Sequence, residues 1–151
     1  MRKVFLLSAI VILTALSTPA QTVSDSVKAA VSRFFTAMKN SDGRGIINSF
    51  TDSAILQTII KDKNGNNVIK TEKIIEFANV VTTMPKDAAD EKISFDMVKV
   101  DGPLATVWTP YKFYFNGQFS HCGVNSFQLV RIGGQWKIQY IIDTRRKQPC
   151  E

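Results

Sequence analysis

Histidine and cysteine are scarce in this chain of 151 residues, which has one histidine and two widely separated cysteines. Zinc sites in proteins draw mainly on these two residue types, grouped at short spacings. The sequence also has no glycine-rich phosphate loop and no Gly-x-Ser-x-Gly nucleophile motif. We therefore expect no zinc site, no cofactor, and neither P-loop nor serine-hydrolase chemistry.

Long apolar runs are also few. The run over residues 4–16 follows Arg2 and Lys3 and precedes the small residues 17–20. It is short for a membrane span and is typical of a secretory signal. We predict cleavage after Ala20, a single domain over residues 21–151, and a periplasmic or secreted protein. No cysteine lies near that cleavage site, so no lipid or other membrane anchor is expected.

The chain is basic, with 19 Lys and Arg against 13 Asp and Glu, a formal charge of +6. Apart from the run at 145–147, the basic residues of the mature part are scattered. A compact basic patch is the usual mark of nucleic-acid binding. Export and this scatter lead us to expect no nucleic-acid partner.

Residues 104–143 predict three long strands joined by tight turns at Asn116-Gly117 and Gly133-Gly134, since these residues tolerate the positive φ of two-residue hairpins. Counting outward from each turn pairs Lys112 with His121 and Phe127 with Tyr140. Side chains alternate between faces, so these pairs define the two sides of the sheet. The predicted inner face carries Trp108, Lys112, Tyr114, Phe119, His121, Asn125, Phe127, Leu129, Trp136, Ile138, Tyr140 and Ile142.

An apolar concave face with a few convergent polar groups is the usual composition of a ligand pocket. A bulge in either hairpin would exchange the faces beyond it. The aromatic side chains could stack on a flat ligand or simply form core, and Lys112 could hold an anionic group or extend its amine to solvent. His121 beside Lys112 should have a lowered pKa and could act as a general base, or it could be structural. The candidate ligand-binding residues are Trp108, Lys112, Tyr114, His121, Asn125, Phe127 and Tyr140.

The rest of the chain predicts an amphipathic helix over 22–41, a short helix over 43–51 and a strand over 54–61. A hairpin loop over 63–67 leads to a short strand at 68–70, followed by a helix over 71–83 that Thr71 would cap. A polar loop over 86–91 and a strand over 92–100 precede the three long strands. This order predicts an α+β fold, with three helices from the N-terminal half packed on a strongly curved antiparallel sheet.

This order of elements, together with the segment at 50–54 and the final strand containing Trp136, resembles the nuclear transport factor 2-like superfamily. The segments at 108–111, 121–124 and 142–146 are similar to its secreted bacterial SnoaL-like and lumazine-binding-like members. The resemblance covers residues 22–145. It implies a cone-shaped, cystatin-like fold with a pocket between sheet and helices, and often a homodimer through the outer face of the sheet.

The predicted outer face is apolar enough to agree with such a contact. Its apolar members are Tyr111, Phe113, Phe115, Val124 and Ile141. Enzymes of the superfamily use carboxylates in the pocket, whereas the predicted register places Asp143 outside. The two cysteines could form a disulfide in an oxidising compartment or remain unpaired.

We therefore expect an exported homodimer that binds a small aromatic or amphipathic molecule without transforming it. One alternative is an isomerase, cyclase or dehydratase with His121 as general base, for which an inward carboxylate near His121 would be the signature. Another is a non-catalytic dimerisation or interaction module whose pocket is filled core.

Overall fold

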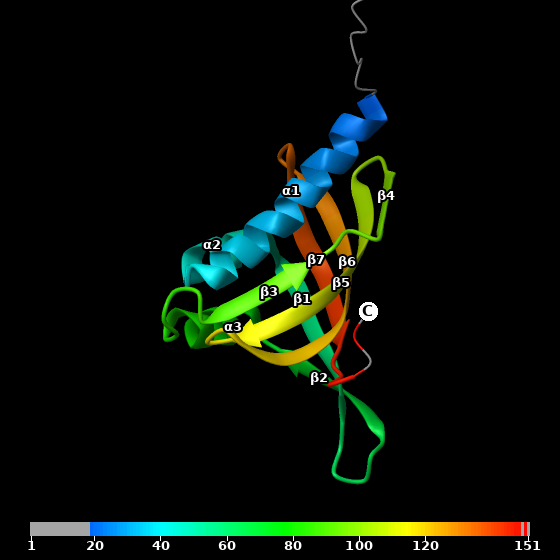
Figure 1. The fold of residues 1–151 in the computed structure, drawn as a ribbon. Coiled ribbons are helices and arrows are strands. Elements are labelled where there is room, and N and C mark those ends of the chain that lie inside the picture. The colour runs from blue at the N-terminus through cyan, green and yellow to red at the C-terminus, as the bar shows by residue number, and fades with distance from the viewer. Residues whose placement is uncertain (1–18, 149, 151) are drawn as a thin grey trace, which may run out of the picture.

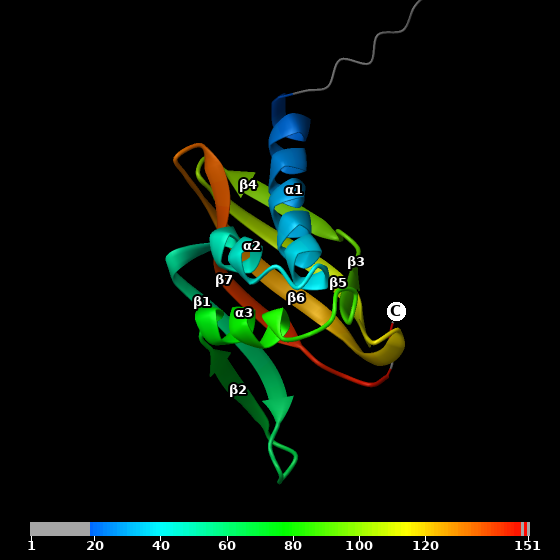
Figure 2. The ribbon, with the colours of Figure 1, turned by 90° about the vertical axis from the view of Figure 1, so that its left-hand side faces the viewer.

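The computed structural model describes residues 19–148 and residue 150. Three helices lie together on one side of a curved seven-stranded sheet (Figures 1 and 2). The elements are α1 (Pro19–Lys39), α2 (Gly43–Ser49), β1 (Phe50–Lys61), β2 (Asn67–Glu72), α3 (Ile74–Thr82), β3 (Ala89–Ile93), β4 (Met97–Asp101), β5 (Leu104–Phe115), β6 (Gln118–Ile132) and β7 (Gln135–Thr144). The α+β fold predicted from the sequence is confirmed.

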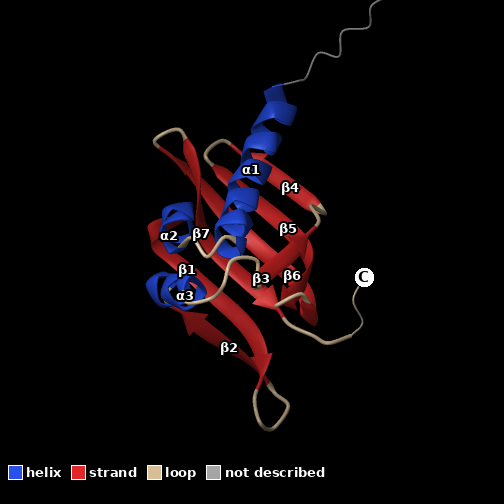
Figure 3. Ribbon diagram, turned by 60° about the vertical axis from the view of Figure 1, so that its left-hand side comes forward, coloured by secondary structure: helices blue, strands red, loops and turns tan. Residues whose placement is uncertain are grey.

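The sheet has the order β2-β1-β7-β6-β5-β3, and β4 pairs with β5 beside β3 (Figure 3). Every pairing is antiparallel except that of β1 with β7, which is parallel. The first and last strands of the domain thus meet in the middle of the sheet. This closes the chain around one core, between the sheet and the three helices.

Helix α1 packs against the sheet along one face. Its apolar residues recur at helical spacing, and this spacing puts them on the buried side. The Phe35 ring meets the Phe127 ring edge-on at 6.0 Å between centroids. Near the start of the helix, the Trp136 indole Nε1 donates to Ser26 Oγ at 3.0 Å. The buried residues of the helix are Val27, Ala30, Val31, Phe34, Phe35, Ala37 and Met38.

Most of the predicted signal, residues 1–18, lies outside the described residues. Its last two positions, Pro19 and Ala20, begin α1. Among the described helices, none has the length and apolarity that a membrane crossing requires. Cleavage after Ala20 and export remain predictions.

Two boundaries differ from those expected. Thr71 does not cap a helix, because it pairs with Gln57 as part of β2, and α3 begins only at Ile74 after Lys73. The supposed polar loop over 86–91 ends in strand β3, and the single strand expected over 92–100 is divided between β3 and β4. In both places strand pairing extends further than the polar side chains suggested, because backbone hydrogen bonding does not require apolar side chains.

Both hairpin turns form as predicted, with Phe115 opposite Gln118 and Ile132 opposite Gln135. Each hairpin then contains a bulge. Ser120 is the extra residue in the first, so His121 pairs with Phe113 instead of Lys112. Gln139 is the extra residue in the second.

Beyond the second bulge, Phe127 pairs with Ile141 instead of Tyr140, and Asn125 pairs with Asp143. An extra residue on one strand shifts the alternation of side chains against its partner. The predicted faces of β5 and of the end of β7 are therefore exchanged.

The exchange also changes the outer face. Phe113 and Ile141, predicted to lie there, pack on the inner side instead. Tyr111, also predicted to lie there, is buried on the inner side against His121 and Asp143. The apolar outer patch invoked for a dimer thus loses three of its five members. The homodimer itself stays a prediction.

Candidate functional site

A cavity of about 150 Å³ lies between the inner face of the sheet and helices α1 and α3. Its helical side is apolar, with Phe34, Phe35 and Met38 from α1 and Phe77 and Val81 from α3. Its sheet side carries a band of polar side chains from β1, β2, β3, β6 and β7 and from Arg145 just after β7. The polar residues lining the cavity are Thr58, Glu72, Glu91, His121, Asn125, Asp143 and Arg145.

Glu91 on β3 belongs to this band. The Asn125 side-chain Nδ2 donates to Glu91 Oε1 at 2.7 Å and also lies 3.4 Å from Thr109 Oγ1. Burial raises the pKa of Glu91 to about 8; the Asn125 hydrogen bond acts against this rise, and the charge of Asp143 adds to it. Glu91 is therefore mostly a neutral carboxylic acid at pH 7.

Asp143 forms the second polar centre, at the end of β7. Its Oδ2 accepts from Arg145 Nε at 3.0 Å, and the Tyr111 hydroxyl lies 3.0 Å from the same oxygen. That hydroxyl is also 2.9 Å from the Thr144 carbonyl oxygen, so its one hydrogen is donated either to Asp143 or to this carbonyl. Burial and the Asp143 carboxylate raise the pKa of Tyr111, which keeps it a phenol. Arg145 also donates to Thr58 Oγ1 at 3.2 Å.

His121 lies beside these groups on β6. Its ring is 5.0 Å from the Phe113 ring centroid and meets Tyr111 edge-on at 5.7 Å. Its Nδ1 lies 3.0 Å from Ser120 Oγ. Burial lowers the pKa of His121, and the positive charge of Arg145 lowers it further, so the ring is neutral at pH 7. The lowered pKa agrees with the sequence expectation, but Lys112 is not its cause.

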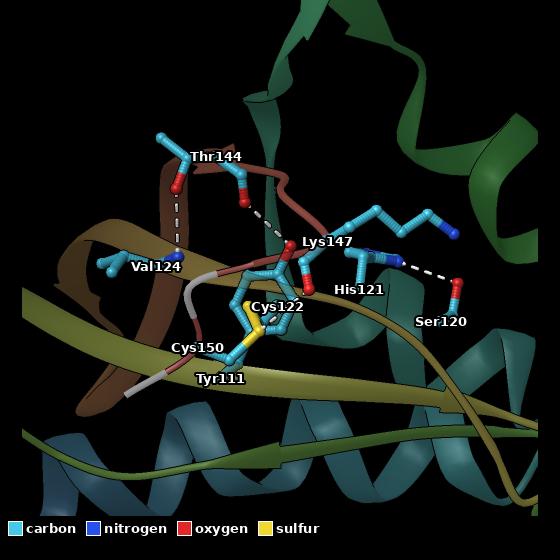
Figure 4. Close-up of a disulfide and its surroundings, with 8 residues drawn as sticks. All are labelled: Tyr111, Ser120, His121, Cys122, Val124, Thr144, Lys147 and Cys150. Carbon is cyan, nitrogen blue, oxygen red and sulfur yellow. Dashed lines mark hydrogen bonds between the residues drawn. A yellow bond between two sulfur atoms is a disulfide. The ribbon is translucent and has the colours of Figure 1, made fainter.

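The segment after β7 is tied to β6 by a disulfide between Cys122 and Cys150 (Figure 4). Cys122 also exchanges two backbone hydrogen bonds of 2.9 Å with Arg146. A disulfide closing a loop of this length typically stabilises a domain by about 2–4 kcal/mol. Of the alternatives left open by the sequence, the disulfide is the one found.

Gly123 lets the same segment approach closely. A side-chain Cβ at this position would collide with the Thr144 carbonyl oxygen and press on the Tyr111 ring. The close approach allows the Tyr111 hydroxyl to reach Thr144, as Figure 4 shows. The disulfide and Gly123 therefore fix the chain on either side of Arg145, whose side chain lines the cavity.

Several solved structures share this architecture. An NTF2-like protein of unknown function from Shewanella baltica OS155 matches with a TM-score of 0.67 at 14% identity, over 88% of this chain and all of that one. A domain of unknown function with a cystatin-like fold from Nostoc punctiforme PCC 73102 matches with a TM-score of 0.63 at 18% identity, over 87% of this chain and 81% of that one. The chain has the NTF2-like fold.

A proposed dehydratase of the NTF2-like family from Streptomyces avermitilis also matches, with a TM-score of 0.62 at 15% identity, over 85% of this chain and 99% of that one. No family model and no curated protein matches the sequence. At these identities the similarity establishes the NTF2-like fold. The narrower SnoaL-like or lumazine-binding-like assignment stays a prediction.

Within this NTF2-like fold, two of the predicted site residues, His121 and Asn125, line the cavity. Phe127 is fully buried in the core. Tyr140 lies outside the cavity lining, where its hydroxyl donates to Gln57 Oε1 at 2.8 Å. The predicted convergence of all seven side chains on one pocket is wrong.

The other three predicted residues, Trp108, Lys112 and Tyr114, lie on the outer face, because the bulge at Ser120 shifts β5 against β6. The aromatic wall of the cavity comes instead mainly from the helices, with Phe113 from the sheet. Lys112 therefore cannot hold an anionic group in the cavity.

The sequence reasoning missed Glu91, Asp143 and Arg145. In the strand expected over 92–100, Ile93, Phe95 and Met97 alternate with polar residues. Followed backward by two residues, this alternation would have placed Glu91 on the same side as Ile93. Asp143 was assigned to the outer face, and the bulge at Gln139 brings it inside. Among the described residues, no three acidic, histidine or cysteine side chains gather as a metal site would require.

Proposed function

We propose that this chain binds a small molecule with an apolar body and a polar head in the cavity beneath α1 and α3. One observation carries the proposal: Glu91, Asn125 and Asp143 meet on the sheet side of a cavity whose helical side is apolar. Such a division orients an amphipathic ligand, because its polar end can be satisfied only at the sheet.

Export and assembly belong to the same proposal. The disulfide supports export, since such bonds persist mainly outside the cytoplasm. Trp108, Phe115 and Phe119 are each more than 40% exposed, which supports a homodimer through an apolar contact. The resemblance of several segments to SnoaL-like and lumazine-binding-like proteins supports a pocket function of that type.

Native mass spectrometry of the protein purified from its own source tests the binding function. Met84 lines the cavity, and Met84→Trp would fill part of it, while the exposed Met97 on β4 offers Met97→Trp as the matched control. We expect a discrete additional mass on the wild type and on Met97→Trp that Met84→Trp loses. Equal masses for all three folded proteins would refute ligand binding in this cavity and favour a filled-core interaction module.

A second candidate function is acid–base catalysis on the bound molecule, such as an isomerisation, cyclisation or dehydration. It is favoured by the protonated Glu91 and the neutral His121, which line one cavity and provide a proton donor and a proton acceptor near pH 7. If the protein is such an enzyme, incubation with wild type converts the bound molecule to a product with a different chromatographic retention and NMR spectrum, and Glu91→Gln leaves the molecule unchanged. A molecule with unchanged retention and spectrum after incubation with both proteins would leave binding alone.

A further inference from the structure

The charges lining the cavity are unevenly matched. Asp143 and Arg145 form an ion pair, and the remaining Arg145 contact is to the neutral Thr58 hydroxyl. Two further carboxyl groups, Glu72 and Glu91, line the same cavity. Within the described part of the chain, no lysine or arginine forms an ion pair with Glu91. The cavity thus holds two more carboxyl groups than its single guanidinium pairs with.

The Glu91 carboxyl group is oriented with one oxygen available. Asn125 Nδ2 donates to Oε1, and no described protein donor bonds Oε2. Nearby cations are engaged elsewhere: Lys39 pairs with Asp90, and Lys92 lies over the Tyr114 ring at 4.7 Å on the other side of β3 and β5. A ligand atom entering the cavity therefore meets an acid that lacks a cationic partner.

This arrangement disfavours the binding of an anionic ligand. A second anion beside Asp143 would compete for Arg145 and face the repulsion of Glu72, since buried charges need partners. A neutral ligand could hydrogen-bond to Glu91 but would supply no charge. An organic cation would supply the missing charge, and its N–H donors would form charge-assisted hydrogen bonds with the carboxylate.

The apolar side of the cavity suits the same class of ligand. Four phenylalanine rings line it, and aromatic faces attract cations as well as apolar groups; they are Phe34, Phe35, Phe77 and Phe113. A cavity of about 150 Å³ accepts a ring the size of benzene. A compact aromatic or aliphatic body carrying one cationic head fits both the size and the lining.

We propose that the natural ligand is a small organic cation, an amine or amidine on a compact apolar body, whose charged head pairs with Glu91. This inference rests on the binding function proposed above. Binding converts the Glu91 carboxylic acid to a carboxylate, and its proton leaves for bulk water, while the ligand keeps its own protons. No covalent bond forms or breaks in the ligand.

The pH response depends on every group that faces Glu91. These are Asn125 and His121 on β6, Tyr111 on β5, Asp143 and Arg145 at the end of β7, and Glu72 on β2. The residues of α1 and α3 that line the cavity carry no charge. Burial holds the pKa of His121 below its ordinary value, whereas the pKa of Glu91 is about 8, so Glu91 is the group whose charge changes most between pH 6.5 and 8.5.

Benzamidine, benzamide and benzoate test the inference, because they share one shape and differ in head charge. Isothermal titration calorimetry at pH 8.5 should give an affinity for benzamidine at least tenfold higher than for benzamide or benzoate. Its affinity should rise by up to tenfold per pH unit from 6.5 to 8, with about one proton released per ligand at pH 7, because Glu91 must ionise. Benzamide should show no such slope.

Glu91→Gln keeps the Asn125 acceptor and removes the charge, so it should abolish both the preference for benzamidine and its pH slope. Glu76→Gln makes the same change on the exposed face of α3, where Glu76 pairs with Lys73, and should behave as wild type. Loss of the preference in both variants would show that Glu91 is not its source and would overturn the inference.

The other outcomes separate this inference from the binding function. Equal binding of benzamide would refute a cationic head but leave the pocket function standing. Stronger binding of benzoate would make Arg145 the anchor of an anion and overturn the inference. If no probe binds but Met84→Trp still loses the additional mass seen on the wild type, the cationic ligand is refuted and the binding function stands. If no probe binds and the wild type carries no additional mass, both proposals fail.

Discussion

The inner face of the sheet has two ends with different compositions. At one end Phe127, Leu129, Trp136 and Ile138 are at most 5% exposed and pack in the core beneath the helices. At the other end, the same strands carry Asn125 and Asp143 to the cavity. The bulge at Gln139 lies between the two on β7.

The comparison shows how one sheet face serves two purposes. At the packed end the apolar side chains contact one another and fill the space between the sheet and the helices, so this end holds the helices in place. The polar end is less completely filled, and it retains buried acids that cost stability but can meet a ligand. Substitutions at the first end should change folding, and substitutions at the second should change pH dependence and binding.

The largest effect is expected at the packed end. Phe127→Ala removes a fully buried ring that contacts Phe34 and Phe35, which should lower the free energy of unfolding by about 3–5 kcal/mol. Urea denaturation measures this, and Phe119→Ala, at a ring that is 44% exposed, is the control with a much smaller change. A loss below about 1 kcal/mol for Phe127→Ala would contradict the division into two ends.

The packed end is also the part that the sequence predicts well. The helical spacing of apolar residues over 22–41 puts Val27, Val31 and Phe34 on one face, and all three are at most 3% exposed. Both hairpin turns were recognised because they need positive φ, which Asn116 adopts at 49° and Gly134 at 79°. Local patterns therefore determined the helices, the turns and the fold.

The polar end was not predictable in the same way. Neither the residue types nor the neighbours of Ser120 and Gln139 distinguish a bulge from regular strand. Each bulge nevertheless exchanges the faces of the residues beyond it relative to the partner strand. Glu91 was assigned to a loop because its neighbours in sequence are polar, while its burial depends on pairing with distant β5. Register and burial at this end are set by tertiary contacts.

A smaller effect is expected in the pH dependence of stability. The pKa of Glu91 is about 8 in the folded chain, above its ordinary value, so the folded state holds a proton that the unfolded state has lost at neutral pH. Stability should therefore fall as pH rises, by about 2 kcal/mol between pH 6.5 and 8.5.

Urea denaturation across this range should give a falling free energy of unfolding for wild type and a nearly flat one for Glu91→Gln. The window matters, because the lowered pKa of His121 changes the stability in the opposite sense, mainly below pH 6.5. The exposed Glu76→Gln provides the control and should keep the wild-type slope. Equal slopes for all three proteins would mean that Glu91 is ionised in the folded chain.

The smallest effect is expected on the outer face, at a residue that the sequence alone placed in the pocket. Trp108 is 41% exposed, and its neighbour Thr109 is fully buried beside Asn125, so the two side chains leave β5 on opposite sides. Trp108→Ser should change the free energy of unfolding by no more than about 1 kcal/mol and benzamidine affinity by less than twofold. Thr109→Val, which removes a hydroxyl partner of Asn125, should weaken benzamidine binding more. A larger loss of benzamidine affinity in Trp108→Ser than in Thr109→Val would place β5 in the register without the bulge. If Trp108→Ser instead dissociates a dimer and leaves binding intact, this face serves assembly.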